Sequence, residues 1–110
     1  MIKENFIMDD EILVITEEKT SDGVRIILKG HVDIMNALLL EKKLDELMER
    51  KENNVLVNME NVNYLSSSGI KACLKMYKEL NSSGGRFKIE QPSMSVKNVL
   101  HAIAFDDFML

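Results

Sequence analysis

Three consecutive serines, Ser66, Ser67 and Ser68, are the residues of this chain best placed to take part in chemistry, and Gly69 follows them. An apolar segment typical of a strand precedes them. A long segment with helical periodicity follows, so the serines mark the start of a predicted helix. The first turn of a helix presents free backbone N–H groups and partial positive charge, and both stabilise a phosphoryl group. One of these serines is therefore a candidate for phosphorylation by a kinase.

Helix capping is the alternative role of the same serines. Serine is a favoured N-cap residue and stabilises a helix by about 1 kcal/mol relative to alanine. A cap needs only one serine, and a glycine directly after the cluster lowers the helix propensity of the first turn. The residues by themselves leave capping and phosphorylation both open.

Other groups that could catalyse a reaction or bind a metal are sparse. Cys73 is the single cysteine, which excludes an internal disulfide, and its place on an apolar helix face predicts a small core residue. His31 and His101 have no histidine or cysteine at ligand spacing, and the chain has no glycine-rich loop of the nucleotide-binding type. The sequence therefore predicts no catalytic site, no metal and no cofactor.

Composition predicts one domain over residues 1–110, because 110 residues with 45% hydrophobic content can bury a single modest core. Residues 1–20 hold six acidic and two basic residues, which accounts for the whole net charge of -4. The balanced remainder has no basic stripe for nucleic acid and no polybasic membrane patch. No secretory signal or membrane-spanning run is present, so we expect a soluble, cytoplasmic protein. The acidic N-terminal segment could be an added strand, a loose tail or a specificity element.

Periodicity and turn residues divide the chain into alternating strands and helices. The predicted strands are residues 11–19, 24–30, 54–59 and 86–90, and the predicted helices run from an Asn36 cap to about Lys51, from about Ser68 to Ser82, and onward from 91–93. The apolar tail, 104–110, is expected to pack back on the rest of the domain. If it forms regular secondary structure, we expect a short strand. This order predicts an α/β fold, with a mixed sheet of four to five strands, an N-terminal hairpin and three to four helices.

The order and spacing of several short motifs resemble the STAS domain of bacterial anti-sigma factor antagonists, over roughly residues 11–108. The motifs are Gly30 and Asp33 in "LKGHVD", the run "YLSSSGI" at 64–70, and the turn formed by Gly84 and Gly85. In that family an aspartate typically precedes the phosphorylated serine. The phosphorylated position corresponds to Ser67 here, and Ser66 replaces the aspartate.

The resemblance implies a partner-switching regulator of transcription. The unphosphorylated protein would bind an anti-sigma factor that is also a serine kinase, and so release a sigma factor. Phosphorylation of Ser67 would end that binding, and a serine phosphatase would reset it; Ser66 and Ser68 are the other candidate phosphorylation sites. The chain would thus be the substrate of a kinase and not an enzyme. The expected partner interface comprises His31, Asp33, Asn36, Tyr64, Ser66, Ser68, Gly69 and Lys71.

A second interpretation within the same family is a constitutive accessory subunit. Such a STAS-like subunit would bind an ATPase without phosphorylation, for example in a lipid-transport ABC system. The charge-free Ser66 and the lack of an acidic motif keep this alternative open. The protein that co-purifies, a kinase or a transporter ATPase, discriminates between the two.

Overall fold

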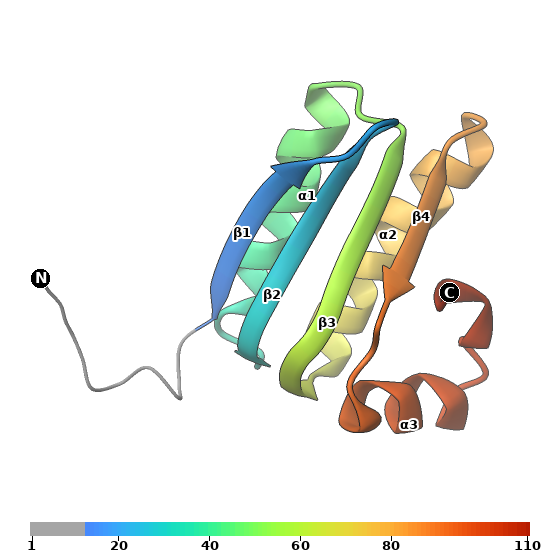
Figure 1. The fold of residues 1–110 in the computed structure, drawn as a ribbon. Coiled ribbons are helices and arrows are strands. Elements are labelled where there is room, and N and C mark those ends of the chain that lie inside the picture. The colour runs from blue at the N-terminus through green and yellow to red at the C-terminus, as the bar shows by residue number, and fades with distance from the viewer. Residues whose placement is uncertain (1–12) are drawn as a thin grey trace, which may run out of the picture.

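Four β-branched and apolar segments pair into one sheet in the order β1-β2-β3-β4 (Figure 1). The computed structural model describes residues 13–110. The strands are β1 Val14–Lys19, β2 Val24–Val32, β3 Asn54–Leu65 and β4 Arg86–Glu90. β1 and β2 form an antiparallel hairpin, whereas β2 with β3 and β3 with β4 are parallel pairs. The predicted α/β fold with a mixed sheet and an N-terminal hairpin is confirmed.

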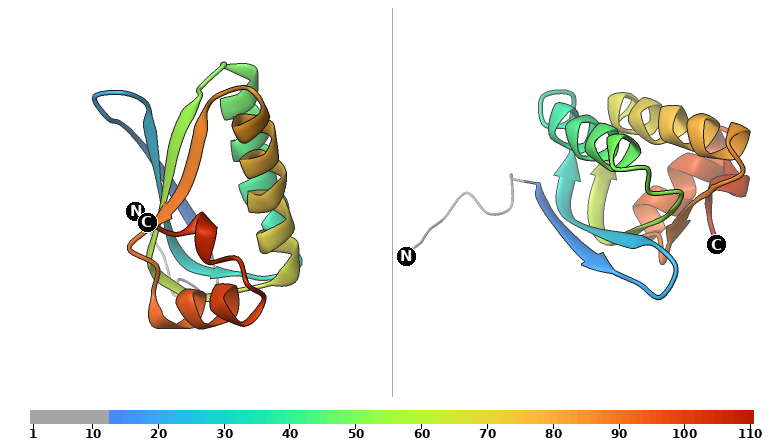
Figure 2. Two further views of the ribbon diagram at one scale, coloured as in Figure 1. Left: turned by 90° about the vertical axis from the view of Figure 1, so that its right-hand side faces the viewer. Right: turned by 90° about the horizontal axis from the view of Figure 1, so that it is seen from above.

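Two long helices, α1 Ala37–Glu49 and α2 Ser67–Ser82, lie side by side on one face of the sheet (Figure 2). A shorter helix, α3 Met94–Ala102, packs at one end of the sheet against β3. A single 3-10 turn, η2 Asp106–Phe108, follows α3 and contacts β4. Each parallel connection therefore passes over the same face, and both α1 and α2 begin where a strand has just ended.

The core lies between this sheet face and the two helices. Alternate residues of β2 are buried, namely Val24, Ile26 and Leu28, as expected for a strand with one covered face. The helices contribute residues at helical spacing to the same cluster, as the sequence predicts. They include Leu40, Leu44 and Leu47 of α1 and Ile70, Cys73 and Met76 of α2.

Two predicted strands prove too short. β2 continues to Val32 and β3 continues to Leu65, because residues after Met59 remain paired with the end of β2. The register shifts twice along this stretch, and Gly30 has a φ of 114°, which favours glycine. Each shift breaks the alternation of apolar and polar residues, so periodicity alone did not reveal the extension.

The C-terminal tail packs back on the body, but it does not form a strand. Met109 makes one isolated bridge to Ile89, and the backbone N–H of Leu110 donates to the carbonyl of Ile89 at 2.9 Å. Phe108 is buried, with its ring centroid 4.6 Å from that of Tyr77. The apolar residues of the tail thus anchor it between β4 and α2. The predicted start of β1 at residue 11 and the role of the acidic segment before it lie outside the described residues.

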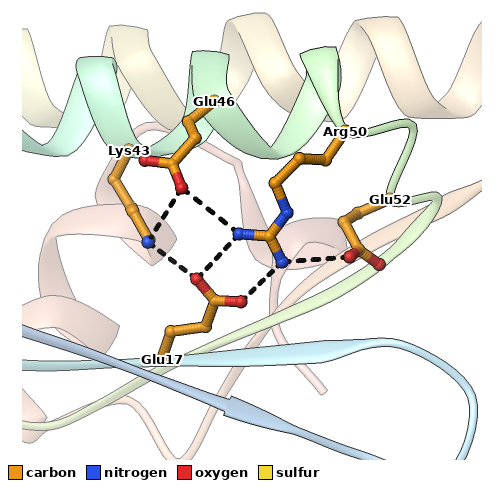
Figure 3. A network of polar contacts seen from close by, with 5 residues as sticks. All are labelled: Glu17, Lys43, Glu46, Arg50 and Glu52. Atoms are coloured by element: carbon orange, nitrogen blue, oxygen red, sulfur yellow. Dashed lines mark hydrogen bonds and ion pairs between the residues drawn. The ribbon is translucent and has the colours of Figure 1, made fainter.

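A network of charged side chains ties the edge strand β1 to α1 (Figure 3). Glu17 on β1 meets Lys43 at 2.7 Å and Arg50 at 2.6 Å, and Arg50 also meets Glu46 and Glu52. Hydrogen bonds from Arg50 and Lys43 hold the pKa of Glu17 at about 2, below its ordinary value of 4.5. The charged form of Glu17 is therefore stabilised by folding.

Glu17→Gln is expected to lower the free energy of unfolding at neutral pH by about 1 kcal/mol, because the pairs are partly exposed and screened. Because folding lowers the pKa of Glu17, the stabilisation is complete above pH 4.5. It is lost as the pH falls to about 2, where the carboxylate becomes protonated in the folded protein. Urea unfolding of both proteins across this range measures the difference. Glu79→Gln, at an exposed position of α2, is the control. If the difference in the free energy of unfolding were as large at pH 2 as at neutral pH, the ionised carboxylate of Glu17 would not be its source.

Candidate functional site

The candidate site lies where β2 and β3 end side by side and both chains turn into helices (Figure 1). His31 is paired with Tyr64 and Val32 with Leu65 in the last positions of this parallel ladder. The backbone N–H of Ser66 then donates to the carbonyl of Val32 at 2.8 Å. The first turns of α1 and α2 are thereby fixed at one edge of the sheet, the edge at which α/β folds commonly bind ligands.

The two roles open to the serine cluster fall to different serines. Ser66 is the N-cap of α2: its backbone is extended, and its Oγ accepts a hydrogen bond from the N–H of Gly69 at 3.2 Å. Only 3% of Ser66 is exposed, whereas Ser67 is exposed and Ser68 is half-buried. The capping role is confirmed for Ser66. Ser67, the first residue of α2, is the most exposed residue of the three.

Gly69 allows α2 to begin close to the strand ends. A Cβ atom at this position would lie 2.7 Å from Cγ1 of Val32 and 2.8 Å from Cδ1 of Leu65. Distances this short do not occur between carbon atoms in relaxed packing, so the site requires the absence of a side chain. Gly69 is itself buried, and it lets the first turn of α2, which carries Ser67, pack against the ends of β2 and β3.

The loop between β2 and α1 is held by reciprocal hydrogen bonds. The N–H of Asp33 donates to Oδ1 of Asn36, and the N–H of Asn36 donates to Oδ1 of Asp33, both at 2.8 Å. Nδ2 of Asn36 also donates to the carbonyl of His31 at 2.8 Å. Asn36 is the N-cap residue of α1, as predicted. Its side chain makes no cap hydrogen bond, because these loop contacts already use it.

Asn36→Ala is expected to lower the free energy of unfolding by about 1–2 kcal/mol, because two hydrogen bonds made by its amide group disappear in a half-buried loop. Chemical unfolding with urea measures the change. Asn81→Ala, at an exposed position of α2, is the matched control and should leave stability nearly unchanged. Equal stability of the Asn36 variant and the wild type would show that the loop is not held in this way.

The remaining predicted interface residues lie around the same edge. Nδ1 of His31 is 3.1 Å from Oδ1 of Asn63, within hydrogen-bonding distance, and Tyr64 is exposed beside it. Lys71 is exposed one helical turn after Ser67. The structure thus brings all the predicted site residues together. Ser66 and Gly69 are buried, so they hold the first turn of α2 in position and are not themselves part of the exposed surface.

The sequence reasoning missed an exposed apolar patch beside the serines. Ile34 and Met35 in the loop and Leu38 in the first turn of α1 are 70%, 81% and 62% exposed. Leu38 lines a groove between α1 and α2 that Ser68 and Lys71 also line. A signal for this patch was available, because Leu38 is apolar yet out of phase with the core positions of α1, and two apolar residues precede the helix in the loop.

No group of three or more histidine, cysteine or acidic side chains within residues 13–110 could hold a metal ion. Cys73 is buried in the core, as predicted, and burial raises the pKa of its thiol to about 12, so the reactive thiolate is disfavoured. Across the same described part, no helix combines the length and apolar character that crossing a membrane requires.

The family model of the STAS domain matches residues 15–110, which is almost the whole of the described chain. This chain belongs to the STAS-domain family. The resemblance predicted from the motifs is confirmed, and the serine cluster lies at the start of α2 of this STAS domain.

A curated protein is similar to part of this chain. The anti-sigma F factor antagonist of Paenibacillus polymyxa is 28% identical over 69 residues, which cover 61% of this chain and 59% of that relative's length. The chain thus spans about three fifths of the curated relative that it matches.

Two solved structures share the fold of this STAS domain. The unphosphorylated form of the anti-sigma factor antagonist SpoIIAA has a TM-score of 0.76 and 22% identity, covering 88% of this chain and 86% of its own. The phosphorylated form of SpoIIAA, described as a Bacillus cell fate determinant, has a TM-score of 0.72 and 22% identity, with coverages of 88% and 89%. At this level of identity, the two structures establish the common fold.

Proposed function

We propose that this STAS domain is an anti-sigma factor antagonist whose binding is switched by phosphorylation of Ser67. In its unphosphorylated form it binds an anti-sigma factor in the cytoplasm and so releases a sigma factor. The observation that carries the proposal is the exposed Ser67 at the first position of α2, next to Ser68, which lines a groove together with the exposed Ile34 and Leu38. The name of the curated relative and the two phosphorylation states of the structural neighbour support it.

The position of Ser67 suits a switch that spares the fold. A phosphate there adds about -1.5 to -2 charges next to the free N–H groups of α2, which stabilise an anion. The helix therefore stays intact. The same charge would lie next to Ser68, at the end of the groove that Ile34 and Leu38 line, and burying it against a partner would cost several kcal/mol. The phosphate would thus abolish one contact without unfolding the protein.

Ser66, which replaces the family aspartate, still supplies the N-cap of α2. Serine and aspartate are about equally good N-caps, and Ser66 caps α2. The substitution removes a carboxylate next to the modified serine but keeps its position. In this proposal a serine kinase, the anti-sigma factor itself, modifies Ser67, and a serine phosphatase removes the phosphate. The chain is then a protein substrate and not a catalyst.

Phosphopeptide mass spectrometry on the protein isolated from its own cells tests the proposal. Trypsin should release residues 52–71, which include all three serines, and fragmentation separates Ser66, Ser67 and Ser68. A phosphate on Ser67 whose occupancy changes with growth and stress is the expected result. A peptide that is well detected yet never phosphorylated would refute the switch and favour the constitutive ATPase-binding subunit.

A further inference from the structure

The groove between α1 and α2 has an apolar floor and a charged rim. Ile34, Ala37 and Leu38 line it from the loop and α1, and Ala72 lines it from α2. Ile34 and Leu38 remain largely exposed, so the chain itself does not cover this apolar surface within residues 13–110. The groove is continuous with the proposed switch, because Ser68 is also part of its lining.

The charges on the rim are unequally paired. Lys75 meets two acidic residues of α1, Asp45 at 3.4 Å and Glu41 at 3.9 Å. Lys71 forms no ion pair with any residue between 13 and 110, and it is exposed. Lys71 is therefore the cation of the groove lining that no acidic side chain among residues 13–110 pairs with. It matches an acidic group on whatever occupies the groove.

Lys71 is also placed to reach a phosphate on Ser67. The two residues are four positions apart on α2, so their side chains are neighbours on the helix surface. An anion followed by a cation four residues later is the favourable orientation of such a pair. A phosphate at Ser67 and an acidic group of a partner would thus be drawn to the same ammonium group.

We propose that the α1–α2 groove docks a segment of the anti-sigma factor that presents an apolar side chain and a carboxylate, and that this carboxylate competes with the Ser67 phosphate for Lys71. The apolar side chain rests on Leu38 and Ile34, and the carboxylate pairs with Lys71. Phosphorylation then weakens binding in two ways. It adds negative charge at Ser67, and the phosphate pairs with the ammonium group of Lys71 in place of the partner's carboxylate. This inference rests on the proposed function and adds the chemistry of the partner surface.

A photo-crosslinking amino acid at position 38, introduced in the protein's own cells, identifies the occupant. The expected adduct is with the anti-sigma factor, at a segment that carries an apolar residue and an acid. The same crosslinker at position 81, on the opposite end of α2, should give no such adduct. An adduct with a second copy of this chain, or none at position 38, would overturn the inference.

A double-mutant cycle with the purified crosslinked partner tests the role of Lys71. Lys71→Gln is expected to weaken binding by about tenfold, and Lys78→Gln, another exposed lysine of α2, should have little effect. Ser67→Asp should also weaken binding less when Lys71 is already glutamine. The loss of affinity that it causes should be about tenfold smaller in the Lys71→Gln protein than in the wild type.

The cycle separates this inference from the proposed function. If Ser67→Asp weakens binding equally in both backgrounds, the shared counter-ion is refuted while the switch remains. If Ser67→Asp has no effect but Lys71→Gln and Leu38→Ala weaken binding, the groove is the docking surface and the proposed switch is refuted.

Discussion

Ser67→Asp is expected to weaken binding to the anti-sigma factor by about 100-fold, whereas Ser67→Ala should change the affinity by less than about twofold. The aspartate places a negative charge at the first position of α2, next to Ser68, which lines a groove together with the exposed Ile34 and Leu38. A partner that covers this surface must remove water from the charge, and an apolar or acidic partner surface cannot replace that water. The alanine removes only a hydroxyl from an exposed position.

Isothermal titration calorimetry with the purified anti-sigma factor measures these affinities. Ser21→Asp, at an exposed position in the turn between β1 and β2, is the charge-matched control, because that turn lies at the opposite end of β2. Thermal unfolding should show that all three variants remain folded, since α2 tolerates an anion at its N-terminus. Wild-type affinity for both Ser67 variants would refute the switch.

Gly69→Val is expected to lower the free energy of unfolding by about 3 kcal/mol and to displace the first turn of α2. The added Cβ would lie 2.7 Å from Cγ1 of Val32, a β-branched residue with little freedom to rotate away. Gly69→Ala should cost less, about 1–2 kcal/mol, because the higher helix propensity of alanine offsets part of the overpacking.

Urea unfolding gives the stability of these variants, and the amide resonance of Ser67 in NMR spectra reports the displacement of the helix start. Ser67→Val is the matched control, because it adds a β-branched side chain to the same turn at an exposed position. It should cost about 0.5 kcal/mol or less. A Gly69 variant as stable as that control would show that α2 does not approach the strand ends this closely.

Much of the fold follows from the sequence alone. The helical spacing of Leu40, Leu44 and Leu47 defines the buried face of α1, because only one side of an amphipathic helix can meet the core. The glycines after α2 and the turn before β2 gave the element order, and that order implies a mixed sheet. The serine cluster and its neighbours likewise located the candidate site, because parallel strands bring their ends to one edge.

The extension of β3 beyond Met59 could not be predicted from the local pattern. Residues 60–65 lack strict alternation, and they pair with β2 only because two register shifts realign the ladder. Such shifts depend on the partner strand, which a local pattern does not contain. The local pattern placed Asn36 at the start of α1 but did not show that its amide group bonds to the backbone of His31 and Asp33 instead of to the helix.

The sequence by itself determined the family, the order of elements and the turn that carries the three serines, because these depend on local periodicity and motif spacing. Only the tertiary structure decided what each serine does. Ser66 is buried as a cap and Ser67 is exposed, although the two are identical neighbours in the chain. It also left Ile34, Met35 and Leu38 uncovered. The physical reason is that burial depends on which segments pack against a residue, and here the ends of β2 and β3 cover Ser66 but leave the surface above it open.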